Sequence, residues 1–228
     1  MKKYTVKELA KMIDHTYLKA FAQESDFVRL CNECKDNGFA MAAINSYPVS
    51  LCHKLLKDTD VHVGAAIGFP LGQTTIAVKV FEAQTAIDDG ADEIDYVLNI
   101  GKLKDGDLDY IKQEMISMKK CCDASNVILK VIFENCYLSQ DEIKQAALIA
   151  KEVKPDFIKT STGFGTYGAR LEDVKLMKET VGSSVKIKAA GGIKDLKTML
   201  AMIEAGAKRI GTSSGISIMK EYQEYLNQ

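Results

Sequence analysis

The stretches DDGADEI (residues 88–94) and EAGAKRI (residues 204–210) share one pattern, although they lie in separate halves of the chain. In each, a helix-type segment ends at Gly-Ala, two charged residues follow, and an apolar strand-type segment begins. Glycine ends a helix at little cost because it adopts a positive φ without a Cβ clash. The two stretches therefore predict two copies of the same helix-to-strand junction.

The rest of the chain continues this alternation of short apolar segments and helical segments. Apolar residues recur at helical spacing over residues 76–87, and Ser139 and Glu142 form the capping-box pattern that begins a helix. The segments between such helices are rich in β-branched and other apolar residues. Eight of them are predicted to be strands: Met12–Thr16, Ala40–Asn45, Val63–Phe69, Glu93–Asn99, Ile128–Glu134, Phe157–Ser161, Val185–Ala190 and Arg209–Ser213.

Strands that alternate with helices indicate a parallel sheet. Eight such units in 228 residues fit a closed (β/α)₈ TIM barrel, here with an additional N-terminal helix. We expect residues 1–228 to form one barrel domain. An open doubly wound sheet is the alternative, and the absence of a G-x-G-x-x-G motif after the first strand weighs against it.

The composition excludes several classes of protein. Hydrophobic residues make up 46% and charged residues 27%, and the formal net charge is −1, so no basic excess indicates nucleic-acid binding. The N-terminal residues lack the apolar core of a signal peptide, and no apolar run is long enough to cross a membrane. We expect a cytoplasmic protein with neither a nucleic-acid nor a membrane partner.

Two of the six cysteines, Cys31 and Cys34, form a C-x-x-C motif. The motif allows a zinc or a redox site, but zinc would need further ligands and no second C-x-x-C or paired-histidine half-site is present, and the spacing also puts both cysteines on one face of a helix. We predict that both cysteines pack on the buried face of a helix.

Polar residues late in the predicted strands are the candidates for chemistry, because the catalytic residues of a TIM barrel lie at the carboxyl ends of its strands. Those residues are Asp14, His15, Asn45, Asp95, Glu134, Lys159 and Lys188.

Lys159 and Lys188 are one βα unit apart, which predicts that they lie on adjacent strands at similar height. Two lysines in a partly dry cavity disfavour each other's charge, and burial disfavours both charges. The neutral amine that results can attack a carbonyl and form a Schiff base, with Asp95 relaying protons. Any single lysine in an apolar segment is more often a surface residue, as we expect for Lys130 and Lys186, so the residues alone leave the two interpretations about even.

Two glycine- and serine-rich loops add a second signal. The sequences AAGGIKD (189–195) and GTSSGIS (211–217) follow the seventh and eighth strands, and each precedes a helical segment. Helix N-termini favour anions, and TIM barrels often bind phosphate at these two loops. Ordinary turns are the alternative interpretation.

Taken together, the motifs resemble the deoxyribose-phosphate aldolase family of class I aldolases, over nearly the whole chain and in that family's order. The matching stretches are IDHTYLK (13–19), IGFPLGQTT (67–75), KVFEAQTAIDDGADEIDYVLNIG (79–101), LKVIFE (129–134), IKTSTGFG (158–165), IKAAGGIK (187–194) and RIGTSSG (209–215).

The resemblance implies a lyase that reversibly cleaves 2-deoxy-D-ribose 5-phosphate to acetaldehyde and D-glyceraldehyde 3-phosphate in deoxyribose phosphate catabolism. It implies no metal and no organic cofactor, phosphosugar and aldehyde substrates, and a homodimer or homotetramer.

The resemblance also implies roles for single residues. By motif, Lys159 forms the Schiff base. Lys188 lowers the pKa of Lys159 and transfers protons together with Asp95, and Asp14 supports this relay. The residues that match substrate and phosphate positions are Thr162, Gly163, Gly191, Gly192, Ser213 and Ser214.

Three positions raise questions. Asn45 stands where many relatives carry a cysteine, and we expect it to lie at the aldehyde pocket and to remove a reactive thiol. Phe164 stands where some relatives place a phosphate-binding lysine, and Lys194 or Arg209 is expected to supply the missing charge. The C-terminal stretch MKEYQEYLNQ (219–228) contains two tyrosines that the resemblance would place over the phosphate, but we expect a solvated, frayed end.

Other functions remain open from the sequence. One is a different lysine-dependent sugar-phosphate aldolase or a transaldolase, and another is a phosphosugar-binding barrel without catalysis. The presence of Lys159, Lys188 and Asp95 together favours an enzyme.

Overall fold

Eight parallel strands close into a barrel in the computed structural model, which describes residues 4–227. Each strand pairs with the next along the chain, and β1 pairs with β8 to close the sheet. The strands are β1 (Ile13–Thr16), β2 (Met41–Asn45), β3 (His62–Ile67), β4 (Glu93–Val97), β5 (Ile128–Ile132), β6 (Phe157–Lys159), β7 (Lys186–Ala190) and β8 (Ala207–Thr212).

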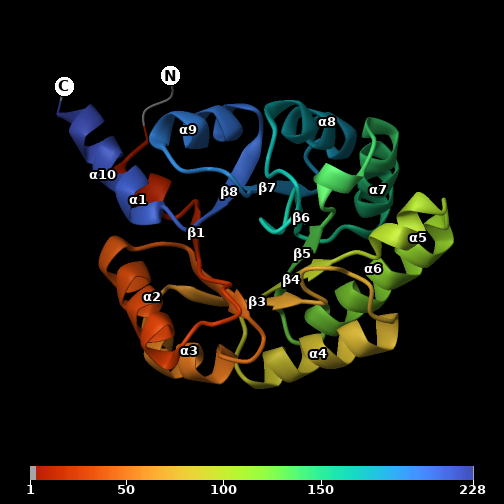
Figure 1. Ribbon diagram of the computed structural model, residues 1–228, viewed down its shortest axis with the longest axis horizontal. Coiled ribbons are helices and arrows are strands. Elements are labelled where there is room, and N and C mark those ends of the chain that lie inside the picture. Colours follow the sequence, from red (N-terminus) through yellow and green to blue (C-terminus); the bar gives the residue numbers. More distant parts are fainter. Residues whose placement is uncertain (1–3, 228) are drawn as a thin grey trace.

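Helices surround this barrel on the outside, as Figure 1 shows. Their apolar faces pack on the strands to form the main hydrophobic core. The helices are α1 (Val6–Ala10), α2 (Glu24–Asn37), α3 (Val49–Leu56), α4 (Ile76–Asp88), α5 (Ile100–Lys104), α6 (Leu108–Asp123), α7 (Gln140–Val153), α8 (Leu171–Val181), α9 (Leu196–Glu204) and α10 (Gly215–Leu226), with a 3₁₀ turn, η1 (Asn135–Tyr137). Within residues 4–227, no helix is long and apolar enough to cross a membrane.

The predicted TIM barrel, its eight strands and its N-terminal helix are confirmed. The two helix-to-strand junctions place Gly90 between α4 and β4 and Gly206 between α9 and β8, both at positive φ. Ser139 and Glu142 make the predicted capping box at the start of α7. Several predicted strands extended about two residues too far into the loops at their carboxyl ends.

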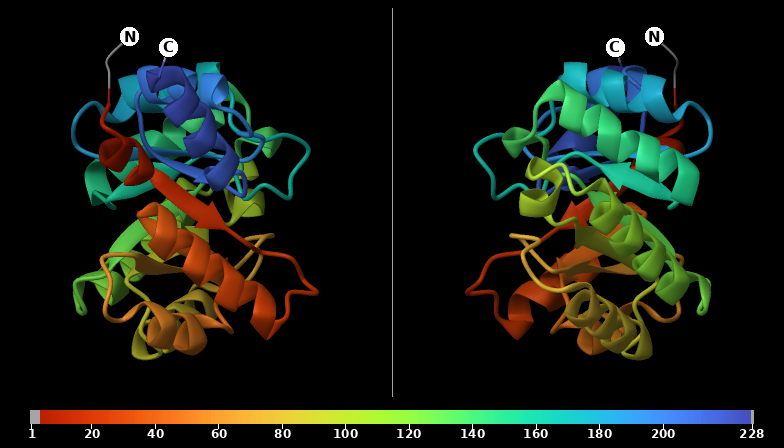
Figure 2. Two further views of the ribbon diagram at one scale, coloured as in Figure 1. Left: turned by 90° about the vertical axis from the view of Figure 1, so that its left-hand side faces the viewer. Right: turned by 90° about the vertical axis from the view of Figure 1, so that its right-hand side faces the viewer.

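The C-terminal stretch is helical, so the expectation of a frayed end is wrong for residues 219–226. Tyr222 is buried, its hydroxyl accepts a hydrogen bond from the backbone N–H of Tyr4 (3.1 Å), and it donates to the Tyr4 carbonyl oxygen. Helix α10 thereby lies beside α1, as both Figure 1 and Figure 2 show. Neither Tyr222 nor Tyr225 lines the cavity described below. Gln228 lies outside the described residues.

The cysteines of the C-x-x-C motif confirm the packing prediction. Cys31 and Cys34 both lie on α2, and both are fully buried in the main core. Burial raises the pKa of the Cys34 thiol, which favours the unreactive thiol form.

Candidate active site

The lysine pair lies at the carboxyl end of the barrel, as predicted. Phe157 and Ile158 are buried strand residues, and Lys159 ends β6 directly after them. Lys159 is the register partner of Lys188 on β7. Both ammonium groups donate to one oxygen, Oδ2 of Asp95 on β4, at 2.8 Å from Lys159 Nζ and 2.7 Å from Lys188 Nζ.

A third lysine contacts the same carboxylate. Lys130 on β5 is fully buried, and its Nζ lies 2.5 Å from Asp95 Oδ1. The expectation that Lys130 is a surface lysine is therefore wrong: its side chain points into the barrel, whereas Lys186 is exposed as expected. Burial alone would raise the pKa of Asp95, but the three ammonium groups outweigh it and hold that pKa well below its usual range.

Lys159 has the electrostatic properties that a nucleophilic amine requires. Its pKa is lowered from 10.5 to about 8: burial is the largest cause, the charge of Lys188 acts in the same direction, and Asp95 opposes both. About a tenth of the amine is then neutral at pH 7, against less than about a thousandth for an ordinary lysine. Loss of hydration is thus the main cause of the shift, and the second lysine is a smaller one.

Asp14 lies below the lysine pair on β1. Its Oδ2 is 2.5 Å from Lys188 Nζ, and its Oδ1 accepts from Arg209 Nε on β8 (2.6 Å). Asp14 therefore touches Lys188 and not Lys159, which fits the supporting position expected for it.

The ion pairs continue toward the amino-terminal end of the strands. Glu93, the first residue of β4, contacts Lys130 Nζ through Oε2 and accepts from Arg209 Nη2 at its Oε1 (2.8 Å). His62, at the start of β3, lies 2.7 Å from the same Oε1 through Nδ1. These ion pairs of Glu93 were not predicted from the sequence, although Glu93 and Asp95 stand two residues apart on one strand and so share a face.

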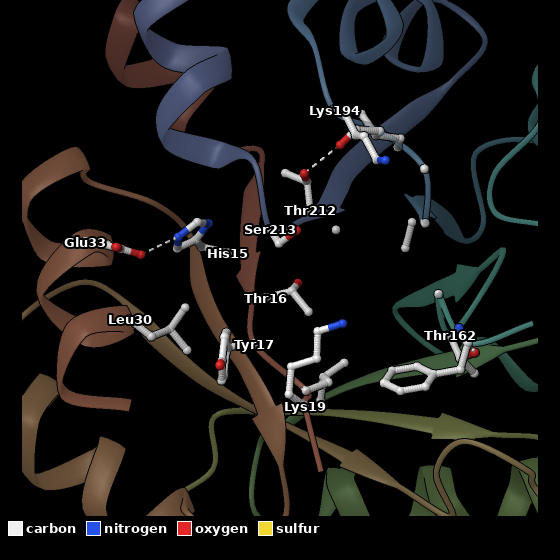
Figure 3. A pocket seen from close by; sticks show the side chains of 18 of the residues that line it. His15, Thr16, Tyr17, Lys19, Leu30, Glu33, Thr162, Lys194, Thr212 and Ser213 are labelled. Carbon is white, nitrogen blue, oxygen red and sulfur yellow. Dashed lines mark hydrogen bonds and ion pairs between the residues drawn. The ribbon is translucent and has the colours of Figure 1, made fainter. Parts of the chain in front are cut away.

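A cavity of about 560 Å³ opens above Lys159, which lies in its lining. Figure 3 shows His15 and Glu33 on one side of this cavity, Thr162 on the opposite side, and Lys194 on a third. The structure brings together there most of the residues predicted to hold the substrate: Thr162, Gly163, Gly191, Gly192 and Ser213. Ser214 and Asn45 lie outside the cavity lining, and Asn45 is a half-buried residue at the end of β2.

The glycines of the cavity have backbone conformations that other residues rarely adopt. Gly191 and Gly192 have φ of 85° and 77°, and Gly163 has φ of 88°. At Gly191 an added Cβ would also lie 2.9 Å from the Cα of Gly168, so the two loops approach closely there. These turns leave the backbone exposed to a ligand, as an anion site requires.

Glu134, after the end of β5, holds the loop that follows Lys159. Its side chain is buried, Oε1 accepts from the backbone N–H of Thr162 (3.1 Å), and Oε2 accepts from the Thr162 hydroxyl. The Thr162 hydroxyl oxygen in turn accepts from the backbone N–H of Phe164 (3.0 Å). One carboxylate therefore fixes the conformation of residues 162–164.

The wall between β1 and α2 was also missed. Thr16 at the end of β1 and Tyr17 and Lys19 from the loop after it line the cavity, as do residues 26, 29, 30 and 33 of α2. Their spacing of three, one and three residues places these α2 side chains on one helix face, a signal that the sequence does contain. His15 joins the two elements, because its Nε2 lies 2.8 Å from Glu33 Oε2.

The charge missing at Phe164 has one candidate replacement among the two expected. Lys194 lines the cavity, whereas the half-buried Arg209 is paired with Asp14 and Glu93 and does not. The expectation for Arg209 is therefore wrong. Phe164 itself lines the cavity and packs edge-on against Phe69, with ring centroids 5.4 Å apart.

Comparison with known proteins agrees with this geometry. Residues 9–221 match the family model described as DeoC/LacD family aldolase. The chain is 59% identical to the deoxyribose-phosphate aldolase of Lactobacillus acidophilus (95% of this chain, 91% of the relative) and 52% identical to that of Bacteroides thetaiotaomicron (96% and 92%).

A solved structure shares the fold as well. The tetrameric deoxyribose phosphate aldolase from Aeropyrum pernix is 28% identical, with a TM-score of 0.90 over 97% of this chain and 93% of that one. With the barrel and the family model in agreement over nearly its full length, the chain belongs to the DeoC/LacD family of aldolases.

Proposed function

We propose that the protein cleaves 2-deoxy-D-ribose 5-phosphate reversibly to acetaldehyde and D-glyceraldehyde 3-phosphate through a Schiff base on Lys159. The observation that carries this proposal is the position of Lys159: its amine lies at the floor of the cavity and has a pKa lowered to about 8. The identity to deoxyribose-phosphate aldolases from two bacteria supports the choice of substrate.

The covalent steps begin with the neutral amine of Lys159. It attacks C1 of the open-chain aldehyde to give a carbinolamine, which loses water to form an iminium. A base then takes the proton of the C3 hydroxyl, and the electrons of the C2–C3 bond move toward the iminium nitrogen. D-glyceraldehyde 3-phosphate leaves, the enamine is protonated at C2, and hydrolysis releases acetaldehyde and the free amine.

Asp95 is the proposed proton carrier, together with Lys188. Asp95 contacts Lys159 directly, and Lys188 donates to the same oxygen. The low pKa of Asp95 makes it a weak base while all three lysines around it are charged. When Lys159 is neutral, one of those charges is absent, so Asp95 becomes a better acceptor at the stage where the carbinolamine forms.

The substrate phosphate is placed between the loops after β6, β7 and β8. Gly163, Gly191 and Gly192 offer exposed backbone there, and Ser213 offers a hydroxyl. Lys194 supplies a positive charge from the same side of the cavity, in place of the lysine that Phe164 replaces. The Ser214 N–H donates to Thr212 Oγ1 (2.9 Å), so Ser214 contributes by shaping this loop.

We further propose that the protein is a cytoplasmic homodimer or homotetramer. The relative from Aeropyrum pernix is tetrameric. The candidate contact residues for such an assembly are large apolar side chains that are strongly exposed. They are Phe21, Tyr47, Leu71 and Phe81.

A product assay tests the proposed reaction. The enzyme is incubated with 2-deoxy-D-ribose 5-phosphate, and acetaldehyde and D-glyceraldehyde 3-phosphate are measured separately. Wild type should release both in equal amounts, and Lys159→Ala should release neither. Release of one product alone, or an unchanged rate in Lys159→Ala, would refute the reaction. Unphosphorylated 2-deoxyribose serves as the comparison that isolates the contribution of the phosphate site.

A further inference from the structure

Charged side chains inside the barrel connect the catalytic lysine to the opposite end of the strands. Lys159 contacts Asp95 (2.8 Å), Asp95 contacts Lys130 (2.5 Å), and Lys130 contacts Glu93. Glu93 and Asp95 lie two residues apart on β4, so their side chains share the inner face of the strand at different heights. Glu93 is fully buried and does not line the cavity.

Arg209 belongs to a second series of ion pairs that joins Glu93 to the residues around Lys159. Its Nη2 lies 2.8 Å from Glu93 Oε1, and its Nε lies 2.6 Å from Asp14 Oδ1. Asp14 contacts Lys188 (2.5 Å), and Lys188 contacts Asp95 beside the catalytic lysine. A change of charge at Glu93 or Arg209 should therefore alter the protonation of Lys159. The two residues are joined to it by ion pairs, and the barrel interior between them is buried, so solvent screens the interaction weakly.

The charges of this network balance without Lys159. Among the described residues, and apart from the titratable imidazole of His62 on Glu93, the ion pairs join three carboxylates to three cations other than Lys159: Asp14, Glu93 and Asp95 against Lys130, Lys188 and Arg209. Protonated Lys159 adds one positive charge beyond these six; the nearby carboxyl of Glu134 interacts with Lys159 electrostatically but is hydrogen-bonded to Thr162. Loss of that proton restores the balance and yields the neutral amine.

We propose that Glu93 and Arg209 are positioning residues that set the protonation of Lys159 from the amino-terminal end of the barrel. This inference builds on the proposed function of Lys159. Two further groups face Glu93 and Arg209 from neighbouring strands. The half-exposed imidazole of His62 contacts Glu93, and Lys186 is exposed on the inner face of β7.

The test compares the pH dependence of kcat/KM for 2-deoxy-D-ribose 5-phosphate, which reports the ionisation of the free enzyme. On the acid side of this profile, kcat/KM falls as Lys159 becomes protonated; we call this fall the acid limb. Arg209→Gln removes a positive charge and so favours the ammonium form of Lys159, and the acid limb should move to higher pH. Glu93→Gln removes a negative charge, so the limb should move to lower pH. Each shift should be roughly one pH unit, as for a unit charge about 10 Å away at an effective dielectric constant of about 20. The double variant should return the limb to the wild-type position.

Matched controls separate charge from structure. Lys208 is also a cation of β8 but is exposed on the outer face, so Lys208→Gln should leave the limb in place. Arg209→Lys loses the forked geometry but keeps the charge, and should also keep the wild-type limb. All variants are compared again in a His62→Gln background, so that the imidazole's own titration does not contribute.

The outcomes are distinct. The proposal is overturned if the acid limbs of both single variants coincide with that of wild type, or if both limbs move in the same direction. If one single variant does not fold, the acid limb of the other decides alone. Borohydride trapping on each variant keeps the proposed function separate. An adduct with an unmoved limb defeats only this inference, whereas no adduct on wild type defeats the Schiff base itself.

Discussion

At the scale of the residue, the catalytic properties of Lys159 arise from its burial and from the charges around it. The lysine pair and Asp95 could be predicted from sequence, because strand periodicity and barrel geometry place them at one end of the sheet. Lys130 could not, since an isolated lysine in a strand has no sequence signal that distinguishes an ion pair inside a barrel from a surface position. Arg209 was expected at the phosphate for the same reason, because its partners come from distant strands.

The lowered pKa of Lys159 predicts the pH dependence of activity. Because only the neutral amine attacks, kcat/KM should fall about tenfold per pH unit below the pKa of about 8. Steady-state assays from pH 6 to 9, with the ionisation of the substrate phosphate measured separately, locate this limb. A limb near the ordinary lysine pKa of 10.5 would contradict the role of burial.

The same shift predicts that the catalytic lysine destabilises the fold. The folded state disfavours the ammonium form, so Lys159→Met should raise the free energy of unfolding by roughly 3 kcal/mol at pH 7 while abolishing activity. This penalty is complete below about pH 8 and disappears as the pH rises toward 10.5, because only the unfolded state is then protonated. Urea titrations at pH 7 and 10 measure the difference; a variant less stable than wild type at pH 7 would be the contrary result.

At the scale of the element, short loops at the carboxyl ends of the strands determine the shape of the cavity. Sequence patterns located the strands and the glycine-rich loops, but several strand ends were placed about two residues too late. Residues after Lys159 look strand-like in sequence, yet Thr162 bonds to Glu134 instead of to a neighbouring strand. Such side-chain contacts between distant segments have no local signature in the chain.

Glu134 should affect catalysis through the loop it holds. Glu134→Gln replaces one acceptor oxygen by a donor, so the Thr162 hydroxyl can no longer donate to it and must accept a second hydrogen bond beside that of the Phe164 N–H; kcat/KM should fall about tenfold or more. Thr162→Val should produce a similar loss, and Thr162→Ser, which retains the hydroxyl, should not. Equal activity of the valine and serine variants would show that this contact does not matter.

Helix α10 should contribute to stability and not to catalysis. Tyr222→Phe removes the two hydrogen bonds to the backbone of Tyr4, so unfolding should become easier by about 1–2 kcal/mol with kcat/KM unchanged. Tyr225→Phe is the matched control, since Tyr225 is exposed. A loss of phosphate-dependent activity in Tyr222→Phe, without loss of stability, would instead place the helix at the active site.

At the scale of the whole molecule, closure of the barrel brings charges from six strands into one buried network. Asp14 of β1 and Arg209 of β8 meet only because these strands pair, so neither contact follows from local sequence. The number of strands, their order and the position of the site could be predicted, because the βα repeat constrains all three. We expect residues 1–228 to unfold as one domain, with a single calorimetric transition.

Association is the second prediction at this scale. Light scattering of the purified protein should give a mass that is twice or four times the 25.1 kDa of one chain. Replacing Phe81, an exposed apolar residue of α4, by aspartate tests whether this surface takes part, and Lys57→Asp is a control at a polar exposed site. A monomer at all concentrations would contradict the proposed assembly.

The central claim is that Lys159 forms the covalent bond to substrate. Its most direct test is reduction with borohydride in the presence of 2-deoxy-D-ribose 5-phosphate, followed by intact-mass measurement and peptide mapping. We predict one stable adduct per chain on the peptide that contains Lys159, with none in Lys159→Ala and with an adduct still formed at a reduced rate in Lys188→Met. An adduct on Lys188, or one that persists in Lys159→Ala, would contradict the account.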